Sequence, residues 1–70
     1  GPVVAYIIAE ELIRLSALLK GRVKGGGYVI LSGIISEKVD IVKESFKNLA
    51  LEKEVREGEW VSLLFKKQRQ

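Results

Sequence analysis

The sequence contains no cysteine, no histidine and no methionine. Without cysteine the chain cannot form a disulfide or a thiolate metal site, and without histidine a zinc, copper or haem site is not expected. Histidine is also the usual base that activates a nucleophilic serine, so none of the serines is expected to act as a nucleophile. We therefore predict no catalytic and no metal-binding residue in this chain, and its stability must come from apolar packing or from another chain.

Long apolar runs are also missing. No run approaches the ~20 residues that a membrane-spanning helix needs, so we expect no membrane partner. We also expect a cytoplasmic location. The chain has 70 residues, and a domain of this size buries only about 60% of its unfolded surface. The first residues include no initiator methionine and no basic signal region. We expect one partial domain over residues 1–70 that begins inside a longer protein.

Charge is balanced along most of the chain. Lysine and arginine number 12 and aspartate and glutamate number 9, which gives a net charge of +3. Lys66, Lys67 and Arg69 supply this excess, and the rest of the chain has nine basic and nine acidic groups. We predict a solvated basic tail over residues 66–70 and do not expect nucleic acid as a partner, because phosphate binding needs several coordinated contacts. An RNA-docking role for this tail is the weaker alternative.

Two apolar segments have the composition of buried strands. Residues 3–8 and 28–32 are rich in β-branched and aromatic side chains, and a Gly25-Gly26-Gly27 turn precedes the second segment. Such a run is typical of a strand that is covered on both faces, as in the parallel sheets of α/β proteins. Because a strand and not a helix follows the glycines, we interpret them as a turn and not as a phosphate-binding loop.

Apolar periodicity predicts two helices. The first covers residues 9–20 and ends at Gly21, because glycine commonly terminates helices. The second begins at Ser36, which is a residue type favoured at the N-cap. The buried stripe of the second helix is predicted to be Val39, Val42, Phe46 and Leu49.

The C-terminal third of the chain predicts an antiparallel hairpin. Residues 51–56 alternate in the manner of a strand at a sheet edge, Glu57-Gly58 forms a turn, and residues 59–66 form a better buried strand. The predicted element order is β-α-β-α-β-β, and the predicted fold class is α/β.

Candidate ligand-binding residues follow from this order, because ligands of open α/β sheets bind at the carboxyl ends of the strands. Tyr6 lies near the end of the first strand, and Ser32 and Gly33 are predicted to form a loop after the second strand. The structural alternatives are a core Tyr6 with a hydrogen-bonded hydroxyl and a Ser32 hydroxyl bonded to local backbone. The carboxylates are predicted to be solvated.

Four stretches of the sequence together have the order and spacing of a known family. They are Val3-Val4-Ala5-Tyr6-Ile7-Ile8-Ala9, Leu12, Val23-Lys24-Gly25-Gly26-Gly27-Tyr28-Val29-Ile30-Leu31-Ser32-Gly33-Ile34-Ile35 and Gly58-Glu59-Trp60-Val61. The chain is similar, from residue 3 to about residue 66, to the C-terminal half of the ribosomal protein L11 methyltransferases. It departs from them at Tyr6, where the family usually has an asparagine beside the cofactor and the target amine.

The resemblance implies the fourth strand onward of a Rossmann-like sheet in an S-adenosylmethionine-dependent enzyme whose substrate is a ribosomal protein. It places the glycine-rich cofactor loop outside these 70 residues, so no cofactor is expected to bind the isolated chain. Tyr6, Ser32 and Gly33 are the pocket residues that the resemblance allows. The first hypothesis is therefore a methyltransferase fragment that is inactive alone.

The alternative is a self-associating structural α/β module without catalysis. The strand from Val3 to Ile8 is expected to expose an apolar edge, which can pair with a second copy of the chain. The predicted partner in that case is a homo-oligomer.

Overall fold

The computed structural model describes the backbone of residues 3–5 and 9–69 and the side chains of residues 11–69. The elements in chain order are β1 (Val3–Ala5), α1 (Ala9–Arg14), α2 (Ser16–Arg22), β2 (Tyr28–Ile35), η1 (Ser36–Lys38), α3 (Val39–Ser45), β3 (Ala50–Glu57) and β4 (Trp60–Lys66). This is the predicted alternation of strands and helices, with the first helix divided in two and a single 3₁₀ turn before the second. The α/β fold class is confirmed.

The strands form one sheet in the order β1-β2-β4-β3. β1 pairs with β2 in parallel, and β2 and β3 each pair with β4 in antiparallel orientation. The predicted C-terminal hairpin is therefore present, and β3 is an edge strand as its alternating sequence predicted. β1 pairs only with β2 among the described strands.

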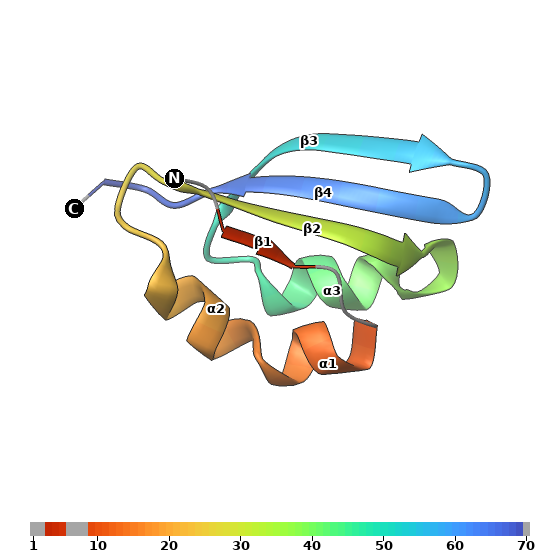
Figure 1. Ribbon diagram of the computed structural model, residues 1–70, viewed down its shortest axis with the longest axis horizontal. Helices are drawn as coiled ribbons and strands as arrows, with labels where there is room; N and C mark the ends of the chain where they lie inside the picture. The colour runs from red at the N-terminus through yellow and green to blue at the C-terminus, as the bar shows by residue number, and fades with distance from the viewer. Residues whose placement is uncertain (1–2, 6–8, 70) are drawn as a thin grey trace.

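All three α-helices lie against the same face of the sheet, as Figure 1 shows. Side chains of β2 accordingly alternate between buried residues such as Val29 and Leu31 and partly exposed residues such as Ile30 and Ser32. Within the described residues this strand is therefore covered on one face only, and its covering on both faces stays a prediction. Its apolar composition reflects one helix-covered face and one face that no described element covers.

The core lies between this covered face and the helices. Its buried residues are Leu12, Val23, Val29, Leu31, Ile34, Val39, Val42, Phe46, Leu49, Val61, Leu63 and Phe65. Phe46 stacks on Phe65 with ring centroids 5.5 Å apart. All four residues of the predicted stripe, Val39, Val42, Phe46 and Leu49, are buried. The helix is shorter than predicted, because α3 ends at Ser45, Phe46 is its C-cap and Leu49 lies beyond it. Burying each such side chain contributes on the order of 1.5–3 kcal/mol to folding.

The helix predicted over residues 9–20 is observed as two helices, α1 and α2, and it ends later than predicted. Leu15 interrupts it, and the second part continues through Gly21 to Arg22. Gly21 is therefore not the terminator. The helix ends where Val23 becomes extended and turns its buried side chain into the core, and the Nζ of Lys67 donates to the carbonyls of Lys20 and Val23.

Ser36 does not form the predicted N-cap. Its hydroxyl donates to Glu37 Oε1 at 3.0 Å, and its backbone N–H donates to the carbonyl of Glu59 at 2.8 Å. The hairpin turn thus holds the start of this segment, which enters α3 through a 3₁₀ turn without a side-chain cap.

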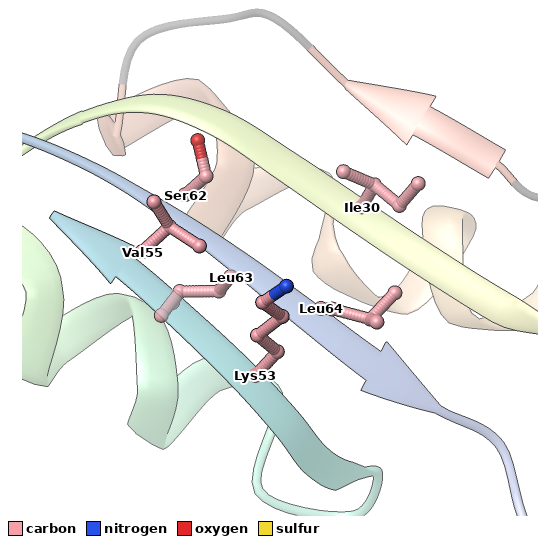
Figure 2. Close-up of a pocket in the computed structure, with 6 residues that line it drawn as sticks. All are labelled: Ile30, Lys53, Val55, Ser62, Leu63 and Leu64. Atoms are coloured by element: carbon pink, nitrogen blue, oxygen red, sulfur yellow. The ribbon is translucent and has the colours of Figure 1, made fainter.

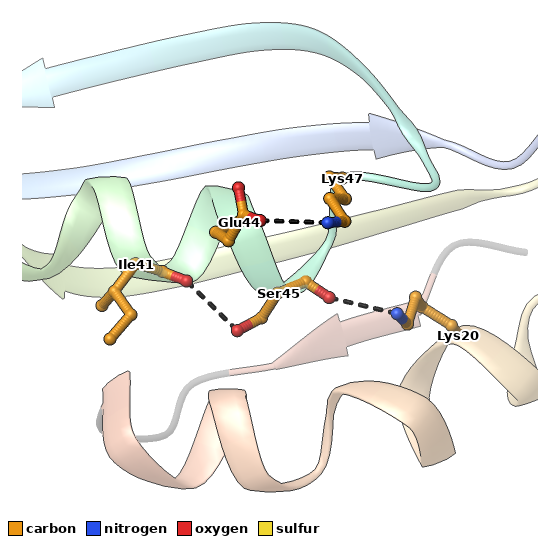
Figure 3. A network of polar contacts seen from close by, with 5 residues as sticks. All are labelled: Lys20, Ile41, Glu44, Ser45 and Lys47. Atoms are coloured by element: carbon orange, nitrogen blue, oxygen red, sulfur yellow. Dashed lines mark hydrogen bonds and ion pairs between the residues drawn. The ribbon is translucent and has the colours of Figure 1, made fainter.

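Lys20 joins α2 to the end of α3, as Figure 3 shows. Its Nζ donates to the carbonyl of Ser45 at 3.1 Å, and the Ser45 hydroxyl donates to the carbonyl of Ile41 at 3.1 Å. The same ammonium group lies 5.9 Å from the centroid of the Phe46 ring. A cation at this position interacts favourably with the last carbonyls of a helix, at the negative end of its dipole, so Lys20 links the two helices.

Candidate functional site

The uncovered face of the sheet is the candidate functional site. We call it the open face and define it by Ile30 and Ser32 of β2, Lys53 and Val55 of β3, and Ser62 and Leu64 of β4. A hollow of about 190 Å³ lies on it, lined by Ile30, Lys53, Val55, Ser62, Leu63 and Leu64. Figure 2 shows these side chains around the three adjacent strands.

Strand alternation produces this face directly from the sequence. In β4 the buried side chains of Val61, Leu63 and Phe65 alternate with Ser62 and Leu64. Ile30 and Lys53 pair with Leu64 from opposite sides, which brings residues of three strands together. Because successive side chains of a strand point to opposite faces, the same alternation that builds the core also leaves an apolar hollow on the outside.

Ser32 and Gly33 lie inside β2 and not in a loop after it. The strand continues beyond them, with Ile34 paired to Val61 and Ile35 paired to Trp60. The register is interrupted between Leu31 and Ile34. Gly33 has a φ of +75°, a left-handed conformation that glycine adopts without steric cost. The predicted loop is therefore a β-bulge, because the additional residue is absorbed at Gly33 while pairing resumes.

The Ser32 hydroxyl is hydrogen-bonded to a side chain and not to local backbone. Its Oγ lies 2.9 Å from the Oγ of Ser62, on the neighbouring strand. The structure thus brings Ser32 and Gly33 together at the bulge beside Ser62. Tyr6, the third predicted cleft residue, lies outside the described residues.

The hydroxyl pair between Ser32 and Ser62 is a feature that sequence reasoning missed. Ser62 is flanked by Val61 and Leu63, which are both buried. Because apolar residues flank Ser62 on both sides, the sequence pattern alone predicts that Ser62 points away from the core. Ser32 and Ser62 lie opposite each other in the register that pairs Ile30 with Leu64 and Leu31 with Leu63, before the register shifts at Gly33.

The described acidic side chains offer neither a metal site nor an evident general base. Among residues 11–69 no group of three or more acidic side chains is arranged to hold a metal ion. Glu54 is the carboxylate with the most contacts, because Lys43 Nζ and Arg56 Nε each lie 2.6 Å from its oxygens. Hydrogen bonds from Lys43 first and Arg56 second lower the pKa of Glu54. The ion pairs with Lys43 and Arg56 thus favour the ionised form of the Glu54 carboxylate. The open face, by contrast, is lined mainly by apolar side chains and is suited to packing against an apolar surface.

No helix within the described residues has the length and apolar character required to cross a membrane.

Comparison with known proteins identifies relatives of this chain. The profile of the family described as "Ribosomal protein L11 methyltransferase (PrmA)" matches residues 2–68. The ribosomal protein L11 methyltransferase of Campylobacter lari is 48% identical over 66 residues, which cover 94% of this chain and 24% of the relative. That of Geobacter sp. strain M21 is 49% identical over 65 residues, which cover 93% and 21%. The chain thus spans about a quarter of the length of these curated relatives.

A solved structure has the same fold. The ribosomal protein L11 methylase of Lactobacillus delbrueckii subsp. bulgaricus superposes with a TM-score of 0.87 at 26% sequence identity. The superposition covers 97% of this chain and 36% of that protein. From the family match over nearly its whole length, the chain belongs to the ribosomal protein L11 methyltransferase family.

Proposed function

We propose that this chain is a scaffold part of an S-adenosylmethionine-dependent methyltransferase that acts on ribosomal protein L11. The family match over residues 2–68 is the observation that supports the proposal. A methyltransferase needs a cofactor loop, and no Gly-x-Gly-x-x-Gly motif occurs in the sequence. The chain by itself is therefore inactive and does not bind the cofactor.

The open face supports the view that more protein belongs on this sheet. A parallel strand pair with helices on only one face is unusual, because parallel sheets occur almost only with both faces covered. Here β1 and β2 are parallel, and Ile30 and Leu64 are only partly covered. We therefore propose that the four strands are one end of a larger Rossmann-like sheet, whose other elements cover the open face.

The cofactor cleft of such a sheet lies at the carboxyl ends of its parallel strands. Tyr6 directly follows β1, and Ser32 and Gly33 form the bulge in the carboxyl half of β2. We propose these three residues as the contribution of this chain to the wall of the cleft. S-adenosylmethionine would supply the methyl group, and the remaining part of the enzyme would hold it.

Self-association of the isolated chain is a second proposal. It is supported by the free edge of β1, which has no strand on the side opposite β2 among the described elements. A second copy can add a strand there through backbone hydrogen bonds.

The test compares the isolated chain with a chimera. In the chimera, this chain replaces the 66 matching residues of the Campylobacter lari relative. S-adenosylmethionine is titrated into each protein by calorimetry, methyl transfer to ribosomal protein L11 is measured with labelled cofactor, and light scattering gives the mass. We expect cofactor binding and methyl transfer from the chimera only. Methyl transfer by the isolated chain, or a folded chimera that does not bind the cofactor, would overturn the scaffold proposal.

A further inference from the structure

A basic surface lies at one end of the sheet, away from the open-face hollow. We call it the basic end and define it by Arg22, Lys24, Lys66 and Arg69. Arg22 ends α2, Lys24 lies in the glycine turn before β2, and Lys66 ends β4. Figure 1 shows this turn and the C-terminal segment side by side at the same end of the molecule. Residues 22–24 and 66–69 thus form one surface, although the sequence separates them.

Backbone hydrogen bonds hold the C-terminal segment in this place. Gly26 N–H donates to the carbonyl of Lys67 at 2.7 Å, and Lys67 N–H donates to the carbonyl of Gly27 at 2.9 Å. Arg69 packs over Gly26 so closely that an added Cβ there would come 3.0 Å from its Nε. The tail is therefore ordered against the glycine turn up to Arg69.

The cations of this region divide into two groups. The ammonium groups of Lys20 and Lys67 donate hydrogen bonds to backbone carbonyls. Arg22, Lys24 and Arg69 form no side-chain hydrogen bond or ion pair with any described residue. Their charges are consequently available to a ligand.

Two adjoining hollows open between these cations. One, of about 370 Å³, is lined by Arg22, Lys24, Arg69 and the three glycines of the turn. The other, of about 380 Å³, includes Lys66, Arg69 and one carboxylate, that of Glu52. Lys66 also lies 5.8 Å from the centroid of the Tyr28 ring, which is 38% exposed. The surface thus combines unpaired cations with an accessible aromatic ring.

Acidic residues gather at the opposite end. Tyr28 pairs with Lys66 at one end of the sheet, and Ile35 pairs with Trp60 at the other. Glu37 lies two residues after Ile35, Glu57 ends β3, and Glu59 lies in the hairpin turn beside Trp60. The longest dimension of the molecule is 35 Å, so the two ends lie well beyond the ~8 Å screening length of physiological salt. The basic end therefore attracts anions with little cancellation from the acidic one.

We infer that the basic end binds the backbone phosphates of a single-stranded nucleic acid. Arginine presents its donors in a planar fork that matches phosphate oxygens, and Tyr28 can stack on a base. A strand of linked phosphates fits two open hollows that share Arg69 better than one small anion does. This inference is independent of the methyltransferase assignment.

The test measures binding of a fluorescein-labelled twelve-nucleotide uridine oligomer to the 70-residue chain by anisotropy. Neutralising three phosphates predicts a salt slope of about −2, which corresponds to an affinity loss of about 20-fold between 50 and 200 mM NaCl. The variant Arg22→Gln/Lys24→Gln/Arg69→Gln should bind about 10-fold more weakly at 50 mM NaCl, with a slope shallower than −1. The control Arg14→Gln/Lys53→Gln/Arg56→Gln has the same net charge of zero and should keep the original slope.

Three outcomes would overturn the inference. They are absence of saturable binding by the unmodified chain, equal losses in both triple variants, and a polyglutamate peptide that competes as well as unlabelled RNA. The salt slope of the unmodified chain provides a measurement that does not depend on the folding of any variant. Circular dichroism of the two triple variants checks that each is folded.

Discussion

Glu54 is the residue at which a pH dependence of stability is expected. Its hydrogen bonds with Lys43 and Arg56 lower its pKa in the folded state below the usual 4.5. A carboxyl whose folded pKa is depressed stabilises the fold above its unfolded pKa and loses that contribution as the pH falls through the folded value. Glu54→Gln should therefore lower the melting temperature at pH 7 and flatten its decline below pH 4.5.

Thermal melts between pH 7 and pH 2.5 test this prediction. Glu52→Gln is the matched control, because Glu52 is an exposed carboxylate of the same strand without an ion pair among the described residues. It should retain the acid-induced decline of the parent chain. Parallel curves for Glu54→Gln and the parent would contradict the proposed role of the Lys43–Glu54–Arg56 cluster.

At the residue scale, polar side chains were placed less well by sequence than apolar ones. Val39, Val42 and Phe46 are buried as predicted because one helical face determines them. Ser36 was predicted to cap a helix, yet the carbonyl of Glu59 binds its backbone N–H. That carbonyl is 23 positions away, and local residue preferences do not contain such partners. The Ser32–Ser62 pair was missed for the same reason.

At the element scale, Gly33 and Gly21 are two positions at which the same substitution is expected to have opposite effects on stability. Neither has any atom within 4 Å of an added Cβ, so alanine fits sterically at both positions. Gly33 has a φ of +75°, whereas Gly21 lies inside α2. Gly33→Ala should destabilise the chain by about 1–2 kcal/mol because alanine is strained in the left-handed region. Gly21→Ala should stabilise it by about 0.5–1 kcal/mol through helix propensity.

Urea unfolding of the two variants measures this contrast. Equal m-values would show that the exposed area is unchanged, so the midpoints report stability. A Gly33→Ala variant as stable as the parent would show that the bulge is not required at this position. The Gly21 result separately tests whether α2 continues through residue 21 in solution.

Elements themselves could be predicted where the periodicity was uninterrupted. The hairpin and α3 follow from alternation in residues 51–66 and from the stripe that ends at Leu49. The break at Leu15 and the bulge at Gly33 could not be predicted, since both interrupt a pattern that continues on either side of them. Each is a local departure that the packing of neighbouring strands and helices decides.

At the scale of the whole molecule, the apolar composition of β2 conflicts with its one-sided burial. Sequence predicted a strand covered on both faces, and the described chain covers one of them. The face of β2 that the described helices leave uncovered belongs to the open face. One-sided burial therefore explains both the exposed apolar side chains of β2 and the position of the candidate site. The parallel pairing of β1 with β2 also indicates that further elements cover the open face, because parallel sheets usually have both faces covered.

The last prediction tests whether the open face is covered in the larger enzyme. Leu64 is partly exposed and pairs with Lys53, so Leu64→Glu should change the melting temperature of the isolated chain little. In the Campylobacter lari chimera, a covering element would bury the new carboxylate and destabilise the protein by about 3 kcal/mol or more. The control Leu18→Glu replaces a side chain that is 54% exposed on α2, the helix-covered side, and should have a small effect in both proteins. Equal effects of Leu64→Glu in the chain and in the chimera would mean that the open face remains in solvent, and the proposal of a larger sheet covered on both faces would fail.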